Sequence, residues 1–107
     1  MLDEQQEIDV YETPRFTKAL AKLSDLQLKV VEDEIDKLIC DPELGEQKKG
    51  DLSHLRVHKF RLENQQVLLG YSWLDKKLEI YLLQLGSHEN FYRDMKSSRK
   101  RDLKLIQ

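Results

Sequence analysis

The chain has 107 residues, of which 39% are hydrophobic and 36% are charged, so residues 1–107 suit a single domain with a real core. The single cysteine, Cys40, excludes an internal disulfide and a cysteine-based zinc cluster, which favours a reducing compartment. The first ten residues are acidic, and no stretch approaches about 18 apolar residues, so we expect neither a secretory signal nor a membrane span. We therefore expect a cytoplasmic protein.

The net charge of −2 conceals an uneven distribution along the chain. Residues 1–46 contain 5 Lys or Arg and 13 Asp or Glu, a balance of −8, whereas residues 47–107 contain 13 and 7, a balance of +6. A basic half can bind nucleic acid even when the whole chain is acidic, but charged stretches are also common on ordinary solvated surfaces. Charge alone leaves both interpretations open.

The chain begins with a predicted strand that leads into a helix. Residues 7–12 alternate apolar and polar side chains, as a short strand does. Thr13 then provides an N-cap, and Pro14 suits the first helical position because its missing N–H would be unpaired there in any case. We predict a first helix over residues 14–22.

A second helix follows almost without a linker. Ser24 or Asp25 can cap it, and Asp41-Pro42 ends it. Its apolar stripe consists of Leu28, Val31, Ile35, Leu38 and Ile39. We expect the two helices to form an antiparallel hairpin with one apolar face on a sheet, and Cys40 to be buried beside the stripe.

The second half of the chain is predicted to be mostly strands. We predict strands at residues 55–62, 66–74 and 78–85. Ser87 can cap a last helix that begins at His88 and has no clear end beyond Lys96. The predicted element order is β-α-α-β-β-β-α, an α+β fold in which a two-helix hairpin packs on a mainly antiparallel sheet.

The first of these strands carries an unusual number of cations. Alternation places Arg56 and His58 on one face, and Lys59 and Arg61 on the other. A cationic sheet face can bind phosphates by charge and by bidentate guanidinium contacts. The alternative interpretation is an edge strand that charge keeps from aggregating.

A second candidate is the imidazole and phenol pair at the start of the last helix. His88 and Tyr92 are four residues apart and share one helix face. At a helix N-terminus such a pair can hold a phosphate near free N–H groups and transfer protons to and from it. The alternative is structural: the aromatic ring packs on the sheet and His88 caps the helix.

The loop at residues 48–54 adds Lys48 and Lys49 but lacks the glycine spacing and Lys-Ser/Thr ending of a phosphate-binding loop. His54 lies in the same loop, and we expect little functional effect from it. The three histidines have no carboxylate or cysteine at a recognised ligand spacing, so we predict no metal site.

With these residues in view, the sequence resembles the RelE/ParE superfamily of type II toxin-antitoxin toxins over about residues 8–96, leaving a basic extension at residues 97–107. The resemblance is carried by YETPRFTKALAKL, by KKGDL followed by LRVHKF, and by the closing GSHENFY. It implies the α+β fold predicted above.

The resemblance also implies one of two activities. RelE-like members are metal-independent, ribosome-dependent mRNA interferases, that is, endoribonucleases, whereas ParE-like members inhibit DNA gyrase. For an interferase, the catalytic residues carried over are Arg56, His58, His88 and Tyr92, and the expected RNA contacts are Lys48, Lys49, Lys59, Arg61 and Arg93. The implied partners are a cognate antitoxin and mRNA on the ribosome, with no cofactor. A gyrase inhibitor and a non-catalytic, antitoxin-binding member remain open alternatives.

Overall fold

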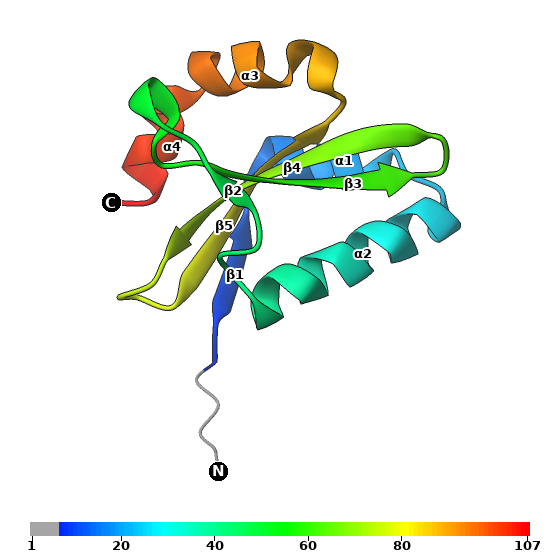
Figure 1. Cartoon of the computed structure of the whole chain (residues 1–107), viewed down its shortest axis with the longest axis horizontal. Helices are drawn as coiled ribbons and strands as arrows, with labels where there is room; N and C mark the ends of the chain where they lie inside the picture. The colour runs from blue at the N-terminus through cyan, green and yellow to red at the C-terminus, as the bar shows by residue number, and fades with distance from the viewer. Residues whose placement is uncertain (1–6) are drawn as a thin grey trace.

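The computed structural model describes residues 7–107 and contains a five-stranded sheet with helices on both sides (Figure 1). The strands are β1 (Asp9–Glu12), β2 (Glu46–Gln47), β3 (Arg56–Leu62), β4 (Gln65–Leu74) and β5 (Glu79–Gly86), and the helices are α1 (Pro14–Ala21), α2 (Asp25–Cys40), the 3-10 turn η1 (Gly50–Leu52), α3 (His88–Ser97) and α4 (Arg99–Leu105). The strand order is β1-β5-β4-β3-β2, in which only the β1–β5 pair is parallel. This architecture confirms the predicted α+β fold.

The first two helices begin where their caps predict. The Thr13 hydroxyl oxygen accepts a hydrogen bond from the first turn of α1, and the hydroxyl donates to the Leu83 carbonyl at 2.8 Å, which fixes α1 to β5. Ser24 and Gln27 form a reciprocal capping box at the start of α2. Ser87 occupies the N-cap position of α3, but its side chain makes no cap hydrogen bond.

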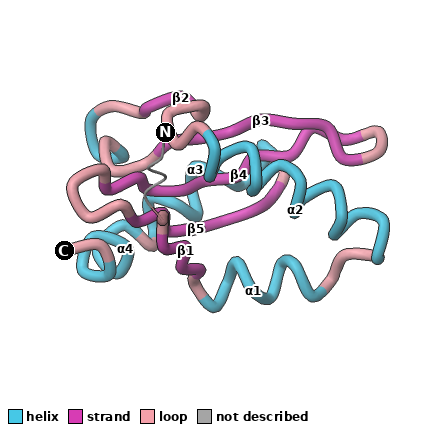
Figure 2. Tube along the Cα trace, turned by 90° about the horizontal axis from the view of Figure 1, so that it is seen from below, coloured by secondary structure: helices cyan, strands magenta, loops and turns pink. Residues whose placement is uncertain are grey.

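Each side of the sheet has its own core. The hairpin of α1 and α2 covers one side and buries Phe16, Val31 and Leu38 against the strands. Helix α3 covers the other side with Phe91 and Met95. Figure 1 shows α3 above the sheet and α2 below it, and Figure 2 shows the hairpin from below. We call these two sides the hairpin face and the α3 face.

The close approach of α3 to the sheet depends on Gly70 in β4. A Cβ atom at this position would lie 2.8 Å from Phe91 Cζ and 3.0 Å from Leu55 Cδ1. Both distances are shorter than normal carbon contacts, so a larger residue would push α3 away. Glycine thus sets the height at which α3 holds its side chains above the sheet.

The residues after Lys96 are more ordered than the sequence indicates. They form α4, whose Asp102 side chain is 2% exposed and pairs with Arg15 of α1. The two guanidinium-to-carboxylate distances are 3.0 and 2.8 Å. The basic extension at residues 97–107 is therefore packed onto the domain by a bidentate ion pair.

Two further elements and one side chain differ from the sequence-based expectations. The short strand β2 and the turn η1 lie in the segment that was expected to be a loop. Cys40 was predicted to be buried, but it is exposed because it is the last residue of α2 and lies beyond the covered part of the helix. Within residues 7–107, no helix is both long and apolar enough to cross a membrane.

Candidate functional site

Strand β3 divides its basic side chains between the two faces of the sheet. Arg56 and His58 are in phase with Phe60, whose ring packs in the hairpin-face core. Lys59 and Arg61 occupy the alternate positions and are exposed on the α3 face. The pairing of β3 with β4 keeps a continuous register along the whole strand, so no bulge changes this division.

Arg56 forms hydrogen bonds to the loop that follows α2. Its Nη1 donates to the carbonyl oxygens of Glu43 at 3.1 Å and Gly45 at 2.7 Å. The Tyr71 hydroxyl accepts from the Gly45 N–H at 2.9 Å and donates to the Pro42 carbonyl at 2.7 Å. Burial raises the pKa of the Tyr71 phenol, which keeps this donor protonated. Arg56 and Tyr71 together fasten the loop to the sheet.

His58 faces α2 and is paired there. Its Nε2 lies 2.7 Å from Glu34 Oε1, with the two side chains 13% and 14% exposed, and Lys37 Nζ lies 2.9 Å from Glu34 Oε2. Burial alone would raise the pKa of the Glu34 carboxyl, but hydrogen bonds from His58 and Lys37 outweigh it and lower this pKa. The sheet separates both Arg56 and His58 from His88, so the four predicted catalytic residues do not form one group.

The α3 face brings Lys48 together with two residues of α3 that lie far from it in the sequence. The His88 and Tyr92 rings meet edge to face, with centroids 5.7 Å apart and planes at 71°. Lys48, in the loop after β2, holds its Nζ 5.3 Å from the centroid of the Tyr92 ring. We call Lys48, His88 and Tyr92 the α3-face cluster. The helix face shared by His88 and Tyr92 follows the spacing predicted from the sequence.

Lys48 is a positioned cation in this cluster. Its Nζ lies 3.0 Å from Glu46 Oε1, and the side chain is 22% exposed. Partial burial works to lower the pKa of the Lys48 ammonium, but hydrogen bonds to Glu46 and Tyr92 outweigh it and raise this pKa. The hydrogen bond from Lys48 also lowers the pKa of Glu46, to which Lys59 adds a smaller electrostatic contribution. The cluster therefore has an ammonium, paired with Glu46, beside an imidazole and a phenol.

The other side chains predicted to contact RNA differ in whether they already have a hydrogen-bond or ion-pair partner. Lys49 and Lys59 are exposed close to the Lys48 ammonium. Arg61 Nη2 donates to the Asn64 carbonyl at 3.0 Å, and Arg93 Nε lies 3.7 Å from Asp94 Oδ1. Both arginines remain at the surface, where such partners are easily exchanged.

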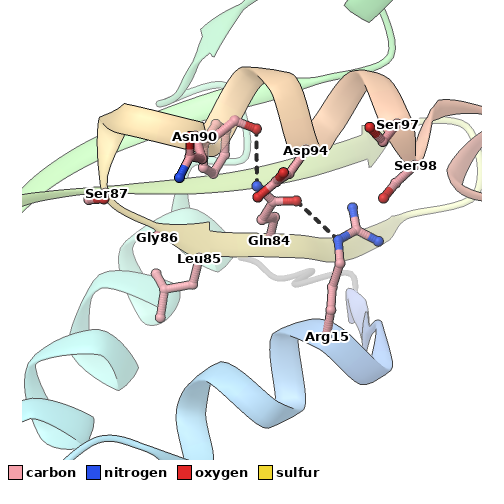
Figure 3. Close-up of a pocket in the computed structure, with 10 residues that line it drawn as sticks. Arg15, Gln84, Leu85, Gly86, Ser87, Asn90, Asp94, Ser97 and Ser98 are labelled. Atoms are coloured by element: carbon pink, nitrogen blue, oxygen red, sulfur yellow. Dashed lines mark hydrogen bonds between the residues drawn. The ribbon is translucent and has the colours of Figure 1, made fainter.

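A cavity of about 490 Å³ lies on the other flank of α3 and contains none of the predicted site residues (Figure 3). In it, Arg15 Nε donates to Gln84 Oε1 at 3.1 Å, and Gln84 Nε2 donates to the Phe91 carbonyl at 3.1 Å. These bonds connect α1, β5 and α3 through Gln84. Arg15 and Gln84 in the cavity wall thus join the two helices to the sheet.

Across residues 7–107, the structure groups no three His, Cys, Asp or Glu side chains as a metal centre would require. The α3-face cluster itself offers one cation and two groups that can exchange protons. Such a set can bind a phosphate and move protons at it. Metal independence remains a prediction from the sequence.

The sequence matches a protein family described as "ParE-like toxin of type II bacterial toxin-antitoxin system" over residues 10–96. A comparison with curated proteins gives no match.

Solved structures share the fold. A variant of Escherichia coli toxin RelE in the free state has a TM-score of 0.69 at 15% identity, covering 89% of this chain and 98% of RelE. A chain of the intact E. coli RelBE toxin-antitoxin complex has a TM-score of 0.64 at 17% identity, covering 78% of this chain and 99% of that chain. A chain of the toxin-antitoxin complex RelBE2 from Mycobacterium tuberculosis has a TM-score of 0.63 at 20% identity, covering 76% of this chain and 98% of that chain.

Proposed function

The chain belongs to the ParE-like toxins of type II bacterial toxin-antitoxin systems, and from this premise we propose that it is an mRNA interferase that cuts messenger RNA on the ribosome. The observation that supports this activity is the α3-face cluster, in which His88 and Tyr92 share one helix face beside the Lys48 ammonium. A toxin that acts only by binding another protein has no need of a proton-transferring pair next to a fixed cation.

The cluster has the groups that RNA cleavage requires. A base removes the proton from a ribose 2′-hydroxyl, whose oxygen attacks the adjacent phosphorus. The bond from phosphorus to the 5′-oxygen then breaks, and an acid donates a proton to that oxygen. His88 and Tyr92 take the acid and base roles between them, and Lys48 stabilises the additional negative charge on the phosphate.

The substrate reaches this site from solvent. His88 is exposed, and Tyr92 is partly buried beneath Lys48. Lys49, Lys59 and the exposed arginines 61 and 93 are placed to contact the RNA backbone by charge, which contributes affinity but no sequence selection. We propose that the ribosome supplies the positioning of the codon, since the domain is too small to enclose an RNA strand.

We also propose a cognate antitoxin as the protein partner. The fold matches solved toxins, some of them in toxin-antitoxin complexes. An acidic segment that folds on binding would complement the basic second half of the chain. An mRNA substrate on the ribosome also places the protein in the cytoplasm.

The catalytic assignment is tested by single-turnover cleavage of mRNA on programmed ribosomes. We expect His88→Ala and Tyr92→Phe each to lower the rate by about 100-fold or more, the range for loss of a positioned acid or base. Thermal melts should be unchanged because His88 is exposed and Tyr92→Phe keeps the ring. Tyr81→Phe is the matched control, since within residues 7–107 its hydroxyl bonds only to Glu79. Full activity in the His88→Ala, Tyr92→Phe double variant would reject the site.

The alternative activities are separated by inducing the chain in bacteria. An interferase should produce new transcript 5′ ends within translated regions while chromosomal DNA stays intact. Intact transcripts with double-strand DNA breaks would favour gyrase inhibition. Neither effect, with antitoxin binding retained, would indicate a non-catalytic member of the family.

A further inference from the structure

The position of α3 decides the geometry of the α3-face cluster. The helix carries His88 and Tyr92, whereas Lys48 belongs to the loop after β2. Packing of Phe91 and Met95 holds α3 against the sheet, but apolar contacts have little directional preference. A hydrogen bond has a preferred direction, so it can also set the rotation of the helix and its place along the sheet.

Gln84 of β5 makes such a hydrogen bond. Its side chain is 8% exposed, and its Nε2 donates to the Phe91 carbonyl at 3.1 Å (Figure 3). This carbonyl is part of the peptide bond that joins Phe91 to Tyr92, so Gln84 holds the backbone directly beside the phenol. Within residues 7–107, no side chain from another element makes a second hydrogen bond to the backbone of α3, and Ser87 gives it no side-chain cap.

The amide of Gln84 is fixed in the orientation that makes it a donor to α3. Half a turn of an amide would exchange its donor and its acceptor. Arg15 Nε donates to Gln84 Oε1 at 3.1 Å, and the two terminal nitrogens of Arg15 bond to the buried Asp102 carboxylate. Because a guanidinium can only donate, the Gln84 oxygen faces Arg15 and the Gln84 nitrogen faces the Phe91 carbonyl.

We propose that Gln84 is a positioning residue for the α3-face cluster, which fixes the rotation of α3 and so keeps His88 and Tyr92 beside Lys48. The inference rests on the proposed function for the use of this cluster in RNA cleavage. Gln84 lines the cavity on the other flank of α3, so it acts on the reaction through the helix. Its loss should slow the chemical step and leave ribosome binding unchanged, because the exposed cations that contact RNA stay in place.

The first test compares two substitutions in single-turnover cleavage of mRNA on programmed ribosomes. Gln84→Met keeps the length of the side chain and removes both of its hydrogen bonds. Gln84→Glu keeps an acceptor for Arg15 but, as a carboxylate, cannot donate to the Phe91 carbonyl. We expect each to lower the maximal rate by about 10- to 100-fold, as for misplaced catalytic groups, while the half-saturating ribosome concentration stays within about twofold.

The matched control is Tyr71→Phe, which removes two hydrogen bonds of a fully buried side chain on the hairpin face. It should lower the unfolding free energy by an amount similar to Gln84→Met and leave the maximal rate within about twofold of the natural one. An equal loss of rate in Tyr71→Phe would overturn the proposal, because reduced stability would then explain the effect. The natural rate in Gln84→Glu would overturn it as well, since the bond to α3 would then be dispensable.

A second measurement follows the position of α3 without any cleavage. Lys48 Nζ lies over the Tyr92 ring, 5.3 Å from its centroid, so the ring current should shift the NMR signals of the Lys48 ε-methylene protons upfield. Both Gln84 variants should lose this shift, and Tyr71→Phe should keep it. Retention of the shift in both Gln84 variants would overturn the proposal.

The two measurements separate the positioning role from the proposed activity. A natural chain that does not cut mRNA, but whose Gln84 variants lose the ring-current shift, would refute the interferase and retain the positioning role. A natural chain that cuts mRNA, with Gln84 variants that cut equally fast and keep the shift, would retain the interferase and refute the positioning role.

Discussion

Basic and imidazole side chains lie on both faces of the sheet, but their partners and their exposure to solvent differ. On the hairpin face, Arg56 Nη1 donates to two loop carbonyls and His58 bonds to Glu34, so both side chains connect neighbouring elements to the sheet. On the α3 face, His88 and Tyr92 lie beside an ammonium and remain open to solvent on one side. The two faces therefore differ in what lies beside the basic residue: backbone carbonyls and a carboxylate on one side, and an imidazole and a phenol on the other.

The largest change in cleavage rate that would test this comparison is expected for a substitution of Lys48. Lys48→Ala removes the cation beside Tyr92, and we expect the cleavage rate on programmed ribosomes to fall by about 100-fold, as for loss of one positioned charge donor. The unfolding free energy should change little, because the ion pair with Glu46 is near the surface. Lys49→Ala is the matched control and should cost only a few-fold. Equal losses in the two variants would mean that the loop acts through general charge.

An intermediate effect is expected on the opposite face. Arg56→Ala removes two hydrogen bonds to backbone carbonyls, so we expect a loss of about 1–2 kcal/mol in unfolding free energy with cleavage nearly unchanged. Urea denaturation and the ribosome assay measure the two quantities. Arg61→Ala, on the same strand but exposed, should change stability by less than about 0.5 kcal/mol. Lost cleavage at unchanged stability in Arg56→Ala would place Arg56 at the active site and break the comparison.

The smallest effect is the pH dependence of the His58–Glu34 pair. The folded-state pKa of Glu34 lies below its ordinary value of 4.5, so its stabilisation is complete above that value and is lost as the pH falls through the folded pKa. Glu34→Gln should therefore be less stable than the natural chain at neutral pH, and the difference should shrink in urea titrations below about pH 4.5. Glu7→Gln, at an exposed carboxylate, serves as control. A difference that is constant down to pH 3 would show that Glu34 acts by packing alone.

Local signals were sufficient for most of the fold. Thr13-Pro14 and Ser24 specify helix starts because a cap depends only on residues within one turn. Strand alternation correctly divided Arg56 and His58 from Lys59 and Arg61, since a side-chain period of two needs no tertiary information. The same local rule could not say which face would be covered by the hairpin.

The features that sequence reasoning missed depend on distant partners. Helix α4 looks like a solvated basic tail unless Asp102 is known to meet Arg15, 87 residues earlier in the chain. The pairing of Lys48 with Tyr92 has no local pattern either. The sequence also showed no sign that His54 Nε2 is buried without a hydrogen-bond partner among the described residues, where burial lowers the pKa of the imidazole. The small functional effect expected of His54 stays a prediction.

The parallel pairing of β1 with β5 has a consequence for the order of synthesis. Asp9 pairs opposite Glu79, so β1 has no neighbouring strand until β5 has been made. Helix hairpins and the β3–β4 hairpin form from neighbouring residues, whereas this closure joins distant ones and is the slower event. A nascent chain therefore carries an unpaired first strand and an open β4 edge while most of its residues are translated. The sheet, and hence the platform beneath α3, is complete only after β5 has been made and has paired with β1.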